Sequence, residues 1–232
     1  HPNVHCFPSS VDVDHFSQAL NRSISHPGHD RIPKPRLGYY GVIDERLDLS
    51  LIAQLADSHP EWQLMLVGPI AKIEKIELPR RQNIHYFGQQ SYEELPRILA
   101  SWDVCLLPFA RNESTRFISP TKTLEYLAAQ LPVVSTDIAD VVELYGKAVS
   151  IAATSAGFVS ACEKVLGESV EERSQRIRAA DSILSSGSWD KTAGKMQELL
   201  SALPQRASVS IGPSRPKNCA SGTPAGGNHK FH

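Results

Sequence analysis

Short apolar runs alternate with stretches of helical periodicity along most of the chain. Runs of this kind, rich in Leu, Val and Ile and followed by glycine or polar residues, are typical of strands that are buried on both faces. The pattern predicts six strands, at residues 37–42, 63–68, 83–88, 104–107, 133–136 and 148–152.

Between and after these runs, apolar residues recur at the i, i+3, i+4, i+7 spacing of an amphipathic helix. Residues 49–58 are the clearest example, with Asp48 as a suitable N-cap. A serine followed by Glu three positions later predicts capping boxes at Ser91 and Ser169. The predicted helices cover residues 49–58, 72–78, 92–100, 120–130, 139–145, 155–167, 169–185 and 189–203.

The regular alternation begins at Leu37 and predicts a doubly wound, Rossmann-like parallel α/β sheet with additional C-terminal helices, over residues 37–203. Residues 1–36 lack sustained periodicity and are predicted to be an irregular linker or remnant. Residues 204–232 are rich in Ser, Gly, Pro and Lys and are predicted to be a disordered tail. A dinucleotide dehydrogenase is not favoured, because the chain has no GxGxxG motif.

The composition describes an ordinary globular chain. It has 232 residues, 41% of them hydrophobic, and a formal net charge of −1, so nothing favours a nucleic acid as partner. No apolar run is long enough for a transmembrane helix, and the four cysteines form no CxxC pair. We therefore expect a cytoplasmic protein, with the inner membrane face as a second, peripheral location. Because the chain opens on His, it is expected to be processed or to be a piece of a longer protein.

Two histidines have the HxxH spacing of some metal ligands, His26 and His29. A structural site would need two more ligands, and the flexible setting favours solvated histidines instead. No metal and no cofactor are therefore assigned.

A helix start between two strands carries most of the functional signal. Ser119 is a suitable N-cap and Pro120 a suitable first helical residue, which would leave the amides of Thr121 and Lys122 free. Those amides and the Lys122 ammonium together predict an anion site that suits a nucleoside diphosphate.

Glu125 follows one helical turn later and shares the face of Lys122, where its carboxylate could accept hydrogen bonds from a diol. On these residues alone, a capped helix with a solvated Lys/Glu face is the favoured alternative. The buried strand at 133–136 changes that balance, because it completes a βαβ unit, and ligands collect at the carboxyl ends of such strands.

Three predicted strands run directly into glycine, at Gly41, Gly68 and Gly88. Glycine allows a sharp turn and lets a ligand approach the backbone, although tight turn chemistry alone explains each of them equally well. Together they are expected to line one edge of the sheet.

The segment SPTKTLEYLAAQLPVVST, preceded by a strand, LPF and a polar loop, resembles the donor-binding, C-terminal half of GT-B retaining glycosyltransferases of the group 1 or family 4-like type. GYYGVIDERLDLSLI, EWQLMLVGP and NIHYFGQQSYEELPRILASWDVCLLPF resemble the preceding parts of that domain, in the same order. SWDKTAGKMQELL resembles its terminal helix, which crosses back over the partner domain, and HPNVHCFPSSVDVDHF resembles the interdomain connection. The resemblance therefore implies that one of two Rossmann-like domains is present.

The resemblance also implies roles for single residues. Glu125 would contact the ribose hydroxyls, while Ser119, Thr121 and Lys122 would face the diphosphate. Gly68 would line the donor site with them.

Gly41 would let the first loop approach the phosphates, with Arg46 as the nearest cation. Here the chain departs from the commoner pattern, which has an arginine after the glycine and a lysine a few residues later, because it has Val42 and no such lysine. A second departure is Phe117, where an acidic residue is expected eight positions before Glu125. Glu113 is the candidate to replace it at the sugar hydroxyls, with a solvated loop carboxylate as the alternative.

The implied activity is hexosyltransferase-like transfer of a sugar from a nucleoside diphosphate-sugar to an acceptor hydroxyl in glycan or polysaccharide synthesis. This half would stabilise the leaving diphosphate without a metal. A glycan or lipid-linked acceptor and any catalytic base would belong to the absent N-terminal domain, so no catalytic residue is assigned here. Two alternatives stay open: a non-catalytic module that binds a nucleotide-sugar, and a GT-B type nucleotide-sugar epimerase.

Overall fold

A computed structural model describes residues 4–7, 9–187 and 189–202 of the chain. The tail predicted over residues 204–232 lies outside the described residues. Within them, no helix has the combination of length and apolar character that crossing a bilayer requires. The three described cysteines, Cys6, Cys105 and Cys162, are all free.

All six predicted strands are present, and they form one parallel sheet in the order β3-β2-β1-β4-β5-β6. The four inner strands are buried on both faces over nearly their whole length, as their continuous apolar character predicts, and the two edge strands are mostly half-buried. The prediction of a doubly wound, Rossmann-like sheet is therefore confirmed. The strands are β1 (Arg36–Tyr40), β2 (Gln63–Val67), β3 (Ile84–Tyr86), β4 (Val104–Leu107), β5 (Val133–Thr136) and β6 (Ser150–Ala152).

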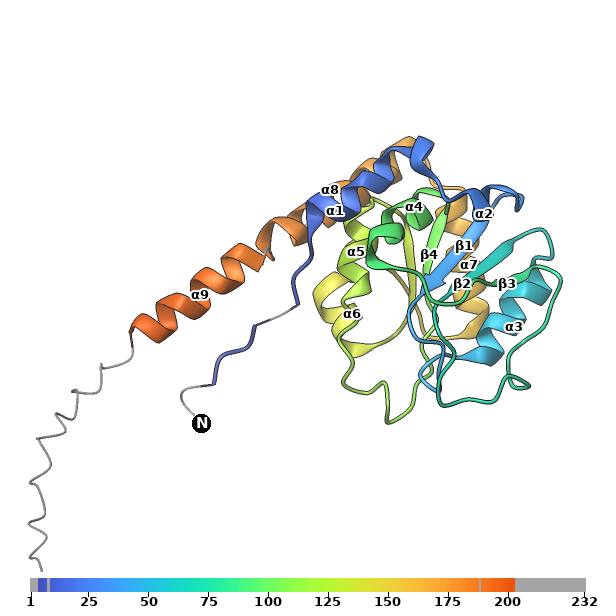
Figure 1. Cartoon of the computed structure of the whole chain (residues 1–232), viewed down its shortest axis with the longest axis horizontal. Coiled ribbons are helices and arrows are strands. Elements are labelled where there is room, and N and C mark those ends of the chain that lie inside the picture. Colours follow the sequence, from blue (N-terminus) through green and yellow to red (C-terminus); the bar gives the residue numbers. More distant parts are fainter. Residues whose placement is uncertain (1–3, 8, 188, 203–232) are drawn as a thin grey trace, which may run out of the picture.

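Helices cover both faces of this sheet (Figure 1). In one layer α3 packs against α7, which lies along β4, β5 and β6. In the other layer α1 contacts both α4 and α5, and α8 packs on α5. The α-helices are α1 (Val13–Ser17), α2 (Pro27–Asp30), α3 (Leu49–Ser58), α4 (Leu95–Ala100), α5 (Lys122–Ala128), α6 (Ala139–Tyr145), α7 (Ser155–Leu166), α8 (Val170–Ser186) and α9 (Trp189–Ser201), with 3-10 turns η1 (Gln18–Leu20), η2 (Arg22–Ile24) and η3 (Tyr92–Glu94).

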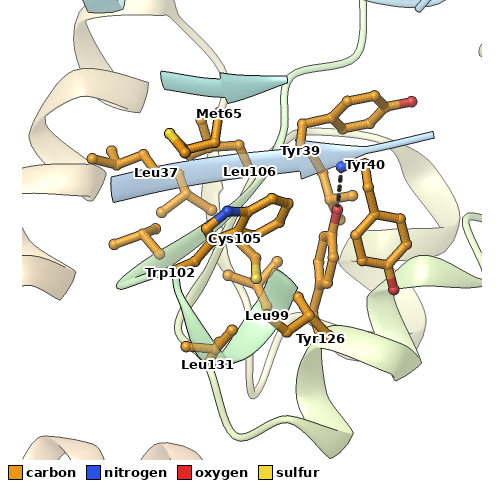
Figure 2. Close-up of a cluster of buried hydrophobic side chains, with 14 of the residues drawn as sticks. Leu37, Tyr39, Tyr40, Met65, Leu99, Trp102, Cys105, Leu106, Tyr126 and Leu131 are labelled. Carbon is orange, nitrogen blue, oxygen red and sulfur yellow. Dashed lines mark hydrogen bonds between the residues drawn. The ribbon is translucent and has the colours of Figure 1, made fainter. Parts of the chain in front are cut away.

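The core surrounds β1 and β4 and contains large aromatic side chains as well as aliphatic ones (Figure 2). Trp102 and Tyr126 are fully buried there, in the same cluster as Leu37 and Met65. Burial of this kind contributes about 1.5 to 3 kcal/mol per large apolar side chain, so the central strands are the most strongly held part of the fold.

Two helix predictions are wrong in detail. Residues 72–78 form turns instead of a helix, because Lys72 has a left-handed φ of 59° and the Glu74 amide donates to the side chain of Glu77. Ser91 does not form a capping box either. A 3-10 turn leads into α4 there, since Pro96 lacks the N–H that a continuous α-helix from residue 92 would use. The capping box at Ser169 is confirmed.

The N-terminal segment is also more ordered than predicted. Residues 12–30 form short helices and turns that pack on α4, with Phe16, Ala19 and His29 buried. His29 is not a solvated histidine, because Trp102 Nε1 donates to its Nδ1 at 3.2 Å. The apolar residues of this segment are too few and too closely spaced to show periodicity. This explains why the hydrophobic pattern of the sequence predicted a linker.

At the other end of the chain, α9 extends away from the sheet (Figure 1). Thr192 on this helix is buried, and its hydroxyl is hydrogen-bonded to that of Ser10, but Trp189, Met196 and Leu200 are exposed. Large apolar side chains of a stable helix are usually covered by other parts of the protein, but no described residue covers these three.

Candidate functional site

The candidate site lies where the strand order reverses, at the carboxyl ends of β1 and β4. From β1 the chain moves outward to β2 and β3, and it then returns to the other side of β1 as β4. Neighbouring strands whose connections run in opposite directions leave a crevice at their carboxyl ends, and ligands of open α/β sheets bind there. The loop after β4 leads into α5, so Lys122 and Glu125 are carried to this crevice.

Two glycines bring the loops after β1 and β2 into direct contact. Gly41 and Gly68 have φ values of 140° and 142°, a region that favours glycine. A Cβ on Gly68 would lie 1.9 Å from the carbonyl oxygen of Gly41, which no side chain can tolerate. A Cβ on Gly41 would lie 3.0 Å from Cε of Lys122. The backbone of Gly41 is therefore next to the Lys122 side chain.

Lys122 is a partly buried cation that lies beside two neighbouring aromatic rings. Its Nζ lies 5.7 Å from the ring centroid of Tyr39 and 5.9 Å from that of Phe109. Burial lowers its pKa, and the charge of Glu125 partly offsets that effect. Within the described residues, no carboxylate lies within ion-pair distance of Lys122. Its charge is thus available to an anion.

Glu125 is held in place by Tyr40, whose hydroxyl donates to Oε2. Burial raises the pKa of Glu125, while the bond from Tyr40 and the charge of Lys122 oppose the rise. The carboxylate keeps its second oxygen for another donor. Glu125 and Lys122 are brought together as predicted, but Tyr40 was missed, because nothing near Glu125 in the sequence indicates a partner on β1.

Tyr126 fixes the position of α5 against β1. Its hydroxyl accepts from the backbone N–H of Tyr40 at 3.1 Å, and the two rings meet edge to face with centroids 5.0 Å apart (Figure 2). The segment that carries Lys122 and Glu125 is therefore tied to the end of β1 by a buried hydrogen bond.

A cavity of about 280 Å³ adjoins this cluster. It lies over the ends of β1 and β2 and the loop after β3, and Leu95 closes one side. Gln89 and Gln90 supply the polar side chains, neither of which the sequence indicated as a site residue. The lining residues are Tyr40, Gly41, Val42, Val67, Gly68, Pro69, Gln89, Gln90 and Leu95.

The predicted helix start is wrong by two residues. α5 begins at Lys122, and Ser119 makes no capping bond, since Thr121 occupies the N-cap position and makes none either. Pro120 is buried, and its carbonyl accepts from Thr123 N in a turn that precedes the helix. α5 has only seven residues, so the Lys122 charge, more than the helix terminus, makes this region attractive to an anion.

Arg46 and Glu113 both have ion-pair partners other than Lys122 and Glu125. Arg46 forms a bidentate pair with Asp44, with Nε to Oδ1 at 2.9 Å and Nη2 to Oδ2 at 2.6 Å. Its charge is therefore shared with a buried carboxylate, although Arg46 still lies close enough to Lys122 to lower the pKa of that lysine. Its role as the nearest cation to the phosphates stays a prediction. Glu113 is highly exposed, and its carboxylate lies 3.9 Å from Arg116. Phe117 in the same loop is 83% exposed.

Metal ligands are not grouped in the part of the chain that the structure describes: no three His, Cys, Asp or Glu side chains are placed to hold an ion. What the cluster offers instead is one available cation, one oriented carboxylate and an adjoining cavity. This combination suits an anionic ligand that also carries hydroxyl groups.

Known proteins are similar to this chain in sequence and in fold. A family described as glycosyl transferases group 1 matches residues 35–168. The chain is 30% identical over 184 residues to the putative teichuronic acid biosynthesis glycosyltransferase TuaH of Bacillus subtilis, an alignment that covers 75% of this chain and 45% of TuaH.

Solved structures agree with the fold. Anabaena HepE, in a complex with UDP and glucose, has a TM-score of 0.67 and 13% identity over 84% of this chain and 56% of HepE. The trehalose-6-phosphate synthase OtsA has a TM-score of 0.66 and 14% identity over 87% of this chain and 52% of OtsA. The chain thus spans about half the length of the relatives it matches. Because the family match covers the whole sheet and the segment with Lys122 and Glu125, the chain belongs to the glycosyl transferases group 1 family.

Proposed function

We propose that this chain is the donor-binding half of a glycosyltransferase, which moves a sugar from a nucleoside diphosphate-sugar to an acceptor hydroxyl. The observation that carries the proposal is Lys122, a partly buried ammonium with no ion pair in the described residues, next to the backbone of Gly41 and the oriented carboxylate of Glu125. A buried charge without a partner is costly to a protein, and it is typical of a functional site.

In this proposal the Lys122 ammonium binds the diphosphate. Negative charge develops on the β-phosphate as the glycosidic bond breaks, and a prearranged cation in a water-poor crevice stabilises it most at that moment. Gly41 allows the phosphates to approach the backbone closely, because it has no Cβ of its own beside Lys122. Ser119 and Thr121 are exposed in the same segment and are secondary candidates for phosphate contacts.

The ribose and the base are assigned to the two neighbouring features. The oxygen of Glu125 that Tyr40 leaves free accepts from the ribose hydroxyls, and such charge-assisted bonds are the strong ones. The adjoining cavity takes the base, with Gly68 at its floor and Gln89 and Gln90 as polar partners. Glu113 keeps a role at the sugar only if its loop moves on binding.

The relatives suggest which ligand to test first. HepE has been solved in a complex with UDP and glucose and in one with UDP-glucose, so UDP is the first donor nucleotide to try. The resemblance to a glycosyltransferase of teichuronic acid biosynthesis supports a role in polysaccharide synthesis. A cytoplasmic location belongs to the same proposal.

The acceptor, and any catalytic base, are assigned to a second half. Exposed Trp189 and Leu200 on α9 support this, because a helix that resembles the terminal helix of these enzymes carries an apolar face with nothing over it in the described residues. An upstream reading frame that encodes a further βα domain of roughly 150 to 200 residues would favour the enzyme over a non-catalytic module.

Calorimetric titration tests the proposal. The full chain, Lys122→Met and Glu125→Gln are each titrated with UDP and with uridine, and Lys147→Met serves as control because Lys147 is an exposed lysine outside the crevice. We expect weak UDP binding to the wild type. Lys122→Met should weaken UDP much more than uridine, whereas Glu125→Gln should weaken both.

Equal affinities across all four proteins would remove Lys122 and Glu125 from the site. Sugar transfer is measured in parallel with the purified chain. None is expected from one half alone, and robust transfer would contradict the assignment of the acceptor side to a second half.

A further inference from the structure

A second candidate site lies at the opposite end of the sheet. A cavity of about 560 Å³ is lined there by Pro35, Asp103 and Pro132, each of which directly precedes a strand. Strands of four or five residues separate it from the donor crevice by roughly 15 Å. A neighbouring cavity of about 430 Å³ shares four lining residues with it, namely Arg22, Lys34, Asp103 and Arg173.

The charges around these two cavities do not balance. Five cations and three carboxylates line them. Each carboxylate already has a cation: Asp30 pairs with Arg36, Asp103 with Lys34 and Glu168 with Arg176. Within the described residues, Arg22 and Arg173 form no ion pair, so two positive charges remain uncompensated.

Arg22 is held in position by the end of α4. Its Nη1 donates toward the carbonyls of Leu99, Ala100 and Trp102, at 3.2, 2.9 and 2.9 Å. Nη2 and Nε make no hydrogen bond to any described residue, and a guanidinium carries five N–H donors in a fixed fork. One side of the guanidinium is therefore anchored, and the other has donors to spare.

Arg173 approaches from the first turn of α8. Burial is the main cause of the lowered pKa of Arg22, and the positive charge of Arg173 lowers it further, although Asp103 opposes both. The two positive charges repel each other, and an anion bound between them would attract both. Arginine is the residue best suited to a tetrahedral oxyanion, because two parallel N–H groups match its oxygens.

We propose that Arg22 and Arg173 bind the phosphate group of a small phosphorylated ligand at the amino end of the sheet, away from the donor crevice. The volume of the cavity favours a phosphomonoester over a bare ion, because a phosphate alone would fill only a small part of 560 Å³. Lys34 and Arg176, with their carboxylate partners, then surround the organic part of the ligand.

The test is a titration of the full chain with glycerol 3-phosphate and, separately, with inorganic phosphate at low ionic strength. Arg173→Gln removes one charge from an exposed side chain that forms no hydrogen bond or ion pair with the described residues. Arg178→Gln is the matched control, since Arg178 is an exposed arginine on the same helix outside both cavities. Lys122→Met reports on the donor crevice.

We expect Arg173→Gln to weaken binding about tenfold and Arg178→Gln and Lys122→Met to leave it unchanged. Tighter binding of glycerol 3-phosphate than of inorganic phosphate would identify an organic phosphate as the ligand, and equal binding would identify free phosphate. The amide resonances of Ser169 and Val170, which line the larger cavity, should shift on binding.

Three results would overturn the proposal: no binding by the wild type, an equal loss in Arg173→Gln and Arg178→Gln, or a loss in Lys122→Met. The last would place the phosphate in the donor crevice. Because the two sites have separate variants, failure here leaves the proposed donor site untouched.

Discussion

The hydroxyl of Tyr40 donates a hydrogen bond to the carboxylate of Glu125, across 85 positions of sequence. Tyr40 ends β1 and Glu125 lies on α5, so the geometry of the carboxylate depends on how the sheet places these two elements side by side. The bond also opposes the rise in the pKa of Glu125 that burial causes, and it thereby favours the charged form that can accept from a ligand.

Loss of this hydroxyl should weaken nucleoside binding. In Tyr40→Phe the carboxylate is no longer oriented, and we expect the affinity for uridine to fall about tenfold, or about 1.4 kcal/mol. The measurement is calorimetric titration. Tyr86→Phe is the control, because it also loses a hydroxyl bond, to the carbonyl of Pro79, but away from the crevice. Equal uridine affinities in the two variants would show that Tyr40 does not position Glu125.

Glu125→Gln should weaken the ligand and spare the fold. The raised pKa means that the carboxyl contributes stability below its unfolded value of 4.5, and that this stability is lost as pH rises through the folded pKa. At pH 7 the wild type carries the cost of burying a charged carboxylate, and the neutral amide of Gln removes that cost. We therefore expect an unfolding free energy equal to or higher than that of the wild type. Uridine affinity should fall by about 1.5 to 3 kcal/mol.

Urea denaturation at pH 7 and titration of the same samples check both halves of this expectation. A marked loss of stability in Glu125→Gln with unchanged affinity would indicate a structural residue. It would then have no role in binding.

Gly68→Ala should destabilise the protein severely. The new Cβ would lie 1.9 Å from the carbonyl oxygen of Gly41 at a φ of 142°, so the loops after β1 and β2 must separate. We expect a loss of about 3 kcal/mol or more in the unfolding free energy. Gly88→Ala is the matched control, since its φ of 66° is left-handed but no atom lies within 4 Å of the new Cβ. It should cost only about 1 to 2 kcal/mol. Similar denaturation midpoints would contradict the close approach.

The buried histidine should make stability fall in mild acid. Burial, with smaller effects from His26 and Arg36, lowers the pKa of His29 from 6.5 to about 4. The unfolded chain takes up a proton over that range and the folded chain does not, so stability present above pH 6.5 is lost as the pH falls toward 4. The loss is at most about 3.5 kcal/mol.

His29→Gln isolates this effect, because it removes the titration and keeps an acceptor for Trp102. His59 acts in the opposite direction, since its raised pKa adds stability at low pH. The difference between wild type and His29→Gln cancels that contribution. The unfolding free energies of the wild type and of His29→Gln, measured from pH 7 to pH 4, should run parallel near pH 7 and separate as the pH falls, because only the wild type loses the contribution of His29. Parallel curves would show that His29 titrates normally.

The sheet could be predicted from the sequence because its signal is local. Val104–Leu107 and Val133–Thr136 are continuous apolar or β-branched runs, and such runs need a cover on both faces whatever the rest of the chain does. The alternation of strands and helices predicts a parallel sheet with ligands at the carboxyl ends of its strands, but it does not predict the strand order. Lys122 and Glu125 share a helix face by spacing alone, so their proximity could also be predicted.

The parts that could not be predicted depend on contacts between distant segments. Tyr40 meets Glu125, and Arg46 is neutralised by Asp44 two residues away in a loop whose conformation has no periodic signal. The left-handed Lys72 ends a pattern that otherwise favours a helix. The burial of His29 depends on Trp102, which lies 73 positions along the chain.

The anchoring of Arg22 to three carbonyls at the end of α4 has a consequence for how the protein unfolds. It joins residues 12–30 to the segment that carries Trp102, in the centre of the core. A fragment that starts at Leu37 would lose Phe16 and His29 from that core, together with the anchor. In a hydrogen-exchange experiment, the amides of residues 12–30 should therefore exchange with solvent at the same rate as those of the sheet. The segment and the sheet then open as one cooperative unit, and the segment does not fray separately.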